Sequence, residues 1–254
     1  MGLRADTARP ISVVGRAVIL VEPCDVVAKV TPLGDSERCA TEVALAIHIR
    51  NHEGPVAPPL VRGEPGPHHT DGVVLSFWEH RPSDSDGELP GYVAGAAYSQ
   101  LAPHLQSYGG ILPDFRAPIR ACQKAVQHDQ LSSLRGAARR LVQDELAMLD
   151  RLDLAPGDIR HLHGDPHLRN LTQSDGKTLW LDLRAACTGP LEWDLSALPP
   201  SAGIETRRQD LLAQLQRLRS ACVVVWCASK ETPAPVELEA IQVHLERLAE
   251  QPAV

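Results

Sequence analysis

Two carboxylates and an amide in the second half of the chain have the residue types and spacing that chemistry requires. Asn170 follows Asp165 by five positions, and Asp182 follows Asn170 by twelve. Phosphoryl transfer needs an aligned acceptor hydroxyl, an acceptor for its proton and a metal ion that neutralises phosphate charge. One carboxylate can accept the proton, while an amide oxygen and a second carboxylate are hard ligands suited to Mg²⁺. The pattern therefore indicates phosphoryl transfer.

The sequence around these residues resembles that of a known family. The loop HGDPHLRN, from His163 to Asn170, resembles the HGDxxxxN loop of aminoglycoside phosphotransferases and choline kinases, a relative of the protein-kinase HRDxxxxN loop. Asp182-Leu183-Arg184 resembles the metal-binding Asp triplet of that family. GPLEWDLS, from Gly189 to Ser196, is similar to its GPxxxDLA tail. Three elements in the family's order and spacing form a specific signal.

The resemblance implies a role for each matching residue. Asp165 would orient or deprotonate the acceptor hydroxyl, while Asn170 and Asp182 would hold Mg²⁺. Asp194 in the tail would steady the catalytic loop, and His163 would pack and hydrogen-bond within that loop. The implied reaction transfers the γ-phosphate of ATP or GTP to a hydroxyl of a small molecule, without a phosphoenzyme.

A lysine near the N-terminus resembles the phosphate-binding lysine of kinases. The segment VVAKV, from Val26 to Val30, is similar to the VAIK strand, which would place Lys29 at the nucleotide phosphates. Glu42, on the predicted helix that follows, is the expected ion-pair partner of Lys29, with Glu37 as the second choice. Ser12 and Gly15 are candidates for a turn that covers the phosphates, although no GxGxxG motif is present.

A nucleobase contact is expected at the end of the N-terminal β-rich part. Phe77, Trp78 and Glu79 end a strand-like run at the position of a kinase hinge, so their backbone groups are expected to face the base. The alternative is that the side chains of Phe77 and Trp78 belong to the core. Both interpretations can hold for different atoms.

Periodicity predicts a small β-rich part followed by a larger helical part. Residues 11–30 form three apolar runs separated by turns, which is typical of a β-meander, and residues 72–78 form another strand-like run. Helical spacing predicts helices at 36–51, 92–105, 117–126, 131–152, 206–228 and 235–250. Ser36 is the expected N-cap of the first of these helices.

These elements predict a bilobal α+β protein, and the resemblance implies a protein-kinase-like fold. We expect a small antiparallel N-terminal sheet of five or so strands in a nucleotide-binding lobe over residues 1–81. A helical lobe over residues 82–254 is expected to carry the catalytic loop and the substrate site.

Composition narrows the class of protein further. The chain has 254 residues, 43% of them hydrophobic, which is enough for a sizeable core. Its six cysteines are scattered without a CxxC pair, which favours reduced thiols and a cytoplasmic location. No apolar run is long enough to cross a bilayer, and no Lys/Arg cluster alternates with aromatics in this chain of net charge −7. Neither a membrane nor a nucleic acid is therefore an expected partner.

Two other functions remain open. The segment HLHGDPH, from His161 to His167, superficially resembles the HxHxDH zinc loop of metallohydrolases. Pro166 interrupts that motif, and His244 is the only histidine further downstream, so a two-zinc site cannot be completed. The other alternative is a non-catalytic, nucleotide-binding pseudokinase, because neither a glycine loop nor a substrate pocket can be recognised.

The loop also departs from the family pattern. The family commonly has HGDLHPGN, whereas Pro166 replaces the leucine here and Leu168-Arg169 replaces Pro-Gly, which adds a positive charge near the phosphates. The expected acceptors are, in order, an aminoglycoside or related cationic antibiotic, another hydroxylated natural product such as a macrolide or peptide antibiotic, and a small metabolite alcohol.

Overall fold

The computed structural model describes residues 5–12, 16–84, 87–128, 131 and 134–250. The chain divides into two compact units, each built from segments that are not contiguous in sequence. The first unit contains Met1–Leu112, His163–Ala186 and Leu198–Gly203, and the second contains Pro113–Leu162, Cys187–Ala197 and Ile204–Val254. The predicted lobe boundary after residue 81 stays a prediction.

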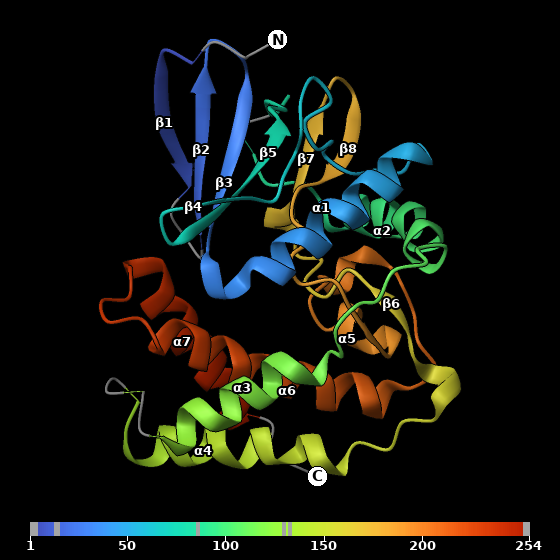
Figure 1. The fold of residues 1–254 in the computed structure, drawn as a ribbon. Helices are drawn as coiled ribbons and strands as arrows, with labels where there is room; N and C mark the ends of the chain where they lie inside the picture. The colour runs from blue at the N-terminus through green and yellow to red at the C-terminus, as the bar shows by residue number, and fades with distance from the viewer. Residues whose placement is uncertain (1–4, 13–15, 85–86, 129–130, 132–133, 251–254) are drawn as a thin grey trace. The chain divides into compact units, whose positions relative to one another are not determined.

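A five-stranded antiparallel sheet forms the N-terminal part of the first unit (Figure 1). Its strand order is β1-β2-β3-β5-β4. The sheet agrees with the predicted antiparallel N-terminal sheet of five or so strands. The strands are β1 (Thr7–Ser12), β2 (Ala17–Glu22), β3 (Val26–Pro32), β4 (His68–Thr70) and β5 (Val73–Glu79). Lys29 lies in the central strand, opposite Val18 of β2 and Ser76 of β5.

Two helices of the first unit follow the predicted pattern closely. They are α1 (Ser36–Asn51) and α2 (Gly91–Gln106). Asp35, rather than Ser36, occupies the N-cap position of α1, because a short 3-10 helix (Leu33–Asp35) leads into it. The face of α1 that is buried in this unit includes Glu42, whose side chain is inaccessible to solvent.

A β-hairpin completes the first unit and directly follows the loop that ends at Asn170. It consists of β7 (Leu171–Ser174) and β8 (Lys177–Trp180), preceded by the 3-10 helix Leu168–Asn170, while a further 3-10 turn spans Pro200–Ala202. Trp180 exchanges backbone hydrogen bonds with the loop after α1, since its N–H donates to Pro55 O and its carbonyl accepts from Ala57 N. The hairpin is thereby fixed to the loop that follows α1.

The second unit is mainly helical. Its helices are α3 (Arg116–Gln127), α4 (Gly136–Ala147), α5 (Leu191–Leu195), α6 (Gln209–Ala228) and α7 (Pro235–Glu250). Two three-residue strands pair in it, β6 (Arg160–Leu162) with β9 (Cys187–Gly189), and 3-10 turns span Met148–Arg151 and Pro156–Asp158. Its core contains Phe115, whose ring centroid lies 5.6 Å from that of Trp193.

Two helices are shorter than predicted. The helix expected at 131–152 begins at Gly136, whose φ of +59° is a left-handed conformation that a right-handed helix cannot continue through. It ends at Ala147 and passes into 3-10 geometry. The helix expected from Thr206 begins at Gln209, because the Thr206 hydroxyl instead accepts the backbone N–H of Arg208 in the preceding loop.

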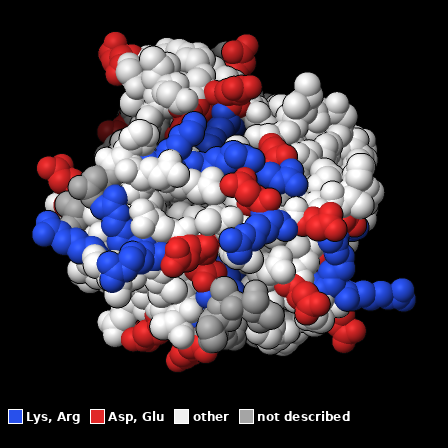
Figure 2. All heavy atoms as spheres, turned by 90° about the horizontal axis from the view of Figure 1, so that it is seen from below, with Lys and Arg blue, Asp and Glu red and all other residues white. Residues whose placement is uncertain are grey.

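The described residues contain no helix that is both long enough and apolar enough to cross a membrane. Figure 2 shows one face of the molecule, on which Lys and Arg side chains lie among Asp and Glu side chains.

Candidate active site

The loop from His163 to Asn170 is closed by its own hydrogen bonds. The Asn170 side-chain Nδ2 donates to the backbone carbonyl of Asp165 at 2.9 Å, and the Asn170 N–H donates to His167 O at 2.9 Å. A further hydrogen bond joins the loop to the segment that contains Asp182, since Leu181 N donates to Asn170 O at 2.9 Å. Asp165, Asn170 and Asp182 are thus brought together, as the sequence predicts.

Glycine is required at position 164. Gly164 has a φ of +85°, and a Cβ built on it would lie 1.8 Å from the backbone carbonyl oxygen of Ala185. No side chain fits within that distance, so only glycine allows the loop from His163 to Asn170 to lie against the segment after Asp182.

The Asp165 side chain is 36% exposed, and its Oδ2 lies 3.4 Å from His167 Nε2. Its backbone N–H donates to Nδ1 of His163 at 3.3 Å. The His163 ring is fully buried, 4.7 Å from the Trp180 ring centroid to centroid. His163 therefore packs and hydrogen-bonds within the loop, as predicted, while the Asp165 carboxylate remains accessible.

Asn170 and Asp182 offer the oxygen atoms that a divalent cation prefers. Because the Asn170 amide nitrogen is used within the loop, its side-chain oxygen is the atom available to a ligand. Asp182 Oδ1 accepts the backbone N–H of Arg184 at 2.9 Å, and the side chain is 32% exposed. An amide oxygen and a carboxylate on adjoining segments fit Mg²⁺.

Lys29 forms the ion pair with Glu42 that the sequence predicts. Its Nζ lies 2.6 Å from Glu42 Oε1. The same ammonium donates to the Leu181 carbonyl at 2.8 Å and lies 3.8 Å from the centre of the Trp78 ring. Burial lowers the pKa of Lys29 in spite of the attraction of Glu42. These contacts tie the central strand of the sheet to α1 and to the residue before Asp182.

Arg16 is a member of this site that the sequence analysis did not identify. Its guanidinium makes a bidentate ion pair with Glu42, with nitrogen–oxygen distances of 2.6 and 2.8 Å. Its Nη2 also lies 3.3 Å from Asp182 Oδ2. In the sequence Arg16 stands in the predicted turn between the first two apolar runs of residues 11–30, and nothing in the local pattern points to a partner 26 positions away.

The two cations keep both carboxylates ionised. Burial alone would raise the pKa of Glu42, but the charges of Lys29 and Arg16 outweigh burial and lower it. Burial likewise opposes ionisation of Asp182, and Arg16 and Lys29 again hold its pKa well below the ordinary value. The site is therefore a network of two cations and two anions.

Two backbone N–H groups of the predicted nucleobase segment donate hydrogen bonds within the protein. Phe77 N donates to Pro65 O at 2.8 Å, and Glu79 N donates to Pro58 O at 3.0 Å. A nucleobase that contacts this segment would have to use other backbone groups. The contact of Phe77, Trp78 and Glu79 with a nucleotide stays a prediction.

The Trp78 side chain belongs to the core, as the alternative interpretation held. It is 2% exposed, and its indole N–H donates to the Ser76 hydroxyl at 2.9 Å. Its ring faces the Lys29 ammonium. Phe77 points to the other face of β5 and lies against the ring of His68, with centroids 5.4 Å apart.

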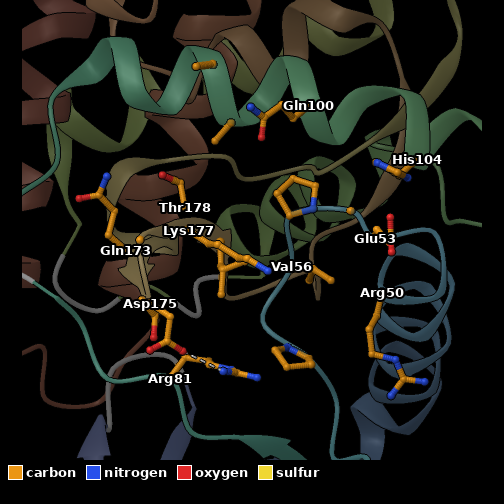
Figure 3. A pocket seen from close by; sticks show the side chains of 18 of the residues that line it. Arg50, Glu53, Val56, Arg81, Gln100, His104, Gln173, Asp175, Lys177 and Thr178 are labelled. Atoms are coloured by element: carbon orange, nitrogen blue, oxygen red, sulfur yellow. Dashed lines mark hydrogen bonds and ion pairs between the residues drawn. The ribbon is translucent and has the colours of Figure 1, made fainter.

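A cavity of about 1280 Å³ lies in the first unit (Figure 3). It is bounded by α2, the loop after α1 and the β7–β8 turn. At its edge Arg81 pairs with Glu79 at 2.6 Å and with Asp175 at 3.3 Å. Its lining includes Glu79, but Asp165, Asn170 and Asp182 are not part of it.

The predicted phosphate-covering turn and the predicted support of the loop by Asp194 both stay predictions. Gly15 lies outside the described residues, and Ser12 ends β1. Asp194 lies on α5 in the second unit, and its contact with the catalytic loop stays a prediction. For the zinc alternative, the described part of the chain contains no group of three or more His, Cys, Asp and Glu side chains that could hold a metal ion.

Comparison with protein-family models identifies one matching family. Residues 15–226 match the model of the phosphotransferase enzyme family, APH. A comparison with curated protein sequences gives no match.

Solved structures similar to the chain share the fold at low sequence identity. The amicoumacin kinase hAmiN, in complex with AMP-PNP, Ca²⁺ and Ami, has a TM-score of 0.67 and 12% identity, over 96% of this chain and 88% of that one. Choline kinase LicA from Streptococcus pneumoniae has a TM-score of 0.63 and 15% identity, over 98% and 95%. The GDP and kanamycin complex of APH(2")-IIia has a TM-score of 0.61 and 17% identity, over 98% and 93%. The predicted bilobal, protein-kinase-like fold is confirmed.

Proposed function

The chain belongs to the phosphotransferase enzyme family, and we propose on this basis that it transfers the γ-phosphate of ATP or GTP to a hydroxyl group of a small molecule. The observation that carries the proposal is a chain of hydrogen bonds. It runs from the Asp165 carbonyl through Asn170 to Leu181, the residue before Asp182. From the Leu181 carbonyl it continues to Lys29, which is paired with Glu42. Phosphoryl transfer depends mainly on positioning and charge neutralisation, and this arrangement supplies both.

Asp165 is the proposed catalytic residue. Its carboxylate is exposed enough to reach an acceptor hydroxyl, while the hydrogen bonds of the loop fix its backbone on both sides. It would orient the hydroxyl and accept its proton as the oxygen attacks the γ-phosphorus. The bond from the γ-phosphorus to the bridging oxygen then breaks, and a nucleoside diphosphate leaves.

Asn170 and Asp182 are the proposed Mg²⁺ ligands. A bound Mg²⁺ would neutralise charge on the phosphate oxygens. The backbone hydrogen bond from Leu181 N to Asn170 O holds the segments of the two proposed ligands beside each other. Lys29, held by Glu42, is proposed to contribute positive charge at the phosphates, and the segment Phe77 to Glu79 to contact the nucleobase.

The proposed acceptor is an aminoglycoside or related cationic antibiotic, and antibiotic resistance would be the consequence. Similar structures include the amicoumacin kinase and complexes with kanamycin or spectinomycin, which supports an antibiotic acceptor. The choline kinases among them keep a small metabolite alcohol as the next candidate. We also propose a cytoplasmic location, because all six cysteines are free thiols.

The test joins nucleotide binding to turnover. Calorimetric titration of ATP and GTP, with and without Mg²⁺, is followed by an assay of nucleoside diphosphate release over a panel of antibiotics and metabolite alcohols. We expect Mg²⁺-dependent binding and release that one class of acceptor stimulates. Absence of binding to both nucleotides at millimolar concentration would overturn the proposal. Binding without acceptor-stimulated release would favour the pseudokinase alternative.

A further inference from the structure

We propose that Arg16 binds the phosphate groups of the nucleotide, exchanging its contact with Asp182 for phosphate oxygens when the nucleotide and its metal ion bind. The inference rests on the proposed function and adds a specificity-determining residue to it. Arg16 directly precedes β2, and its side chain is 4% exposed. It therefore points into the site and not into solvent.

The donor groups of Lys29 are already in use. An ammonium group has three N–H bonds, and Lys29 faces the Glu42 carboxylate, the Leu181 carbonyl and the Trp78 ring. A phosphate that approached Lys29 would have to displace one of these partners. In this structure the Lys29 ammonium links elements of the first unit, and it has no N–H group ready to donate to a phosphate unless one of these contacts is displaced.

Arg16 retains donor capacity. A guanidinium has five N–H bonds, of which two go to Glu42 and a third faces Asp182. The planar group can still present a pair of N–H bonds to an oxyanion, which is the geometry that arginine uses for phosphate.

The contact with Asp182 is the one that can be exchanged. Its nitrogen–oxygen distance is 3.3 Å, against 2.6 and 2.8 Å to Glu42, so Glu42 holds the guanidinium in place more tightly. Asp182 is also the proposed metal ligand, and a Mg²⁺ ion held by its carboxylate would offset the negative charge that faces Arg16. A buried cation that loses a counter-charge needs another, and a phosphate oxygen supplies it.

Four proteins test this: the wild type, Arg16→Gln, Arg16→Lys and the control Arg9→Gln. Arg9 is an exposed arginine on β1 of the same sheet, so its replacement makes the same change in net charge outside the site. Calorimetry measures binding of AMP-PNP or GMP-PNP with Mg²⁺ and of the matching nucleoside. Thermal unfolding confirms that each variant is folded.

We expect Arg16→Gln to bind the triphosphate analogue about tenfold or more weakly, the scale of a lost charge-assisted hydrogen bond, and the nucleoside with unchanged affinity. Arg16→Lys should lie between it and the wild type, and Arg9→Gln should match the wild type. Equal weakening of nucleoside and analogue, or no weakening of either, would overturn the inference. If the wild type binds neither analogue, the proposed function itself fails.

A wild-type structure decides the matter even if both Arg16 variants fail to fold. With Mg²⁺ and the analogue bound, we expect Arg16 nitrogens within hydrogen-bond distance of phosphate oxygens and Arg16 no longer in contact with Asp182. An Arg16–Asp182 contact that persists beside the bound analogue would contradict the exchange.

Discussion

Asp165 and Asp182 are chemically identical side chains in different surroundings. Asp165 has an exposed carboxylate with His167 beside it, which suits a group that must meet a substrate. Asp182 faces Arg16 and receives the Arg184 N–H, so its charge is stabilised by the protein. The first environment favours proton transfer and the second favours a permanent anion that can bind metal. The two substitutions should therefore have separable effects.

Asp165→Ala should reduce turnover by about 10²- to 10⁴-fold, the contribution typical of a general base, because it removes the carboxylate that would accept the hydroxyl proton. The affinity for nucleotide should be nearly unchanged. Steady-state kinetics and calorimetry measure the two quantities. Asp144→Ala, which removes an exposed aspartate from α4, is the matched control and should leave turnover unaffected. Full turnover in Asp165→Ala would refute the role of Asp165.

Asp182→Asn should weaken nucleotide binding in the presence of Mg²⁺ about tenfold or more, since the metal loses a charged ligand. Without Mg²⁺ the affinity should change much less. Titrations of one nucleotide at several Mg²⁺ concentrations separate the two contributions. Equal affinities of variant and wild type in saturating Mg²⁺ would contradict the assignment of Asp182 as a metal ligand.

Single residues differed in how far the sequence could predict them. The Lys29–Glu42 pair is found because both partners stand at motif positions, and the short distance confirms it. Arg16 was missed because its two carboxylate partners come from a helix and a loop that lie far away along the chain. A turn residue gives no sign of which way its side chain points until the tertiary structure is known.

Elements were predictable where hydrophobic periodicity was long and uninterrupted. The bounds of α1 and α7 agree with the sequence prediction, whereas β6 and β9 have three residues each, too few to show a period. The predicted helix at 131–152 was too long because Gly136 adopts a left-handed conformation. Backbone handedness at one residue is decided by tertiary packing, which apolar spacing does not reveal.

Gly164→Ala should destabilise the first unit by roughly 2 kcal/mol or more, because the left-handed backbone and the contact with the Ala185 carbonyl both oppose a Cβ. Turnover should fall with it, since the loop that holds Asp165 must move. Chemical denaturation and kinetics measure these effects. Gly34→Ala is the control, because a Cβ there meets no atom within 4 Å. Wild-type stability and activity in Gly164→Ala would show that the loop tolerates a side chain.

For the whole molecule, stability should depend on pH through a histidine in the second unit. Burial, and next the charge of Arg247, lower the pKa of His244 to about 4, below its ordinary value of 6.5. Between these values the unfolded chain binds a proton that the folded chain does not. Stability is therefore lost as pH falls through this window.

His244→Asn should remove part of that dependence. The wild type should lose about 1–2 kcal/mol more than the variant between pH 7 and pH 4.5, allowing for the partial solvent exposure of the ring. Urea unfolding at the two pH values gives the difference. His244 Nδ1 lies 3.0 Å from the Ser220 hydroxyl, so the variant is compared with itself across pH rather than with the wild type at one pH. Parallel pH profiles would contradict the lowered pKa.

For the whole molecule, the sequence predicts the α+β class and the family. It does not predict which segments of the chain pack into the same compact unit. The α+β class follows from the order of β-like and helical runs, and the motifs between His163 and Ser196 identify the family. The segment His163–Ala186 nevertheless joins the first compact unit, although it lies deep in the C-terminal part of the chain. Only contacts between distant residues, such as Lys29 with Leu181, establish that grouping.

That contact has a consequence for how the protein reaches its native state. The Leu181 carbonyl is 152 positions beyond Lys29, so the acceptor is synthesised long after the strand that carries the donor. Closing such a contact early costs chain entropy, and pairings of this separation slow folding. An N-terminal fragment that ends at Leu112 would bury the Lys29 ammonium with one acceptor missing. The five-stranded sheet should thus acquire its native stability late, only after the chain has returned to it from the helical second unit.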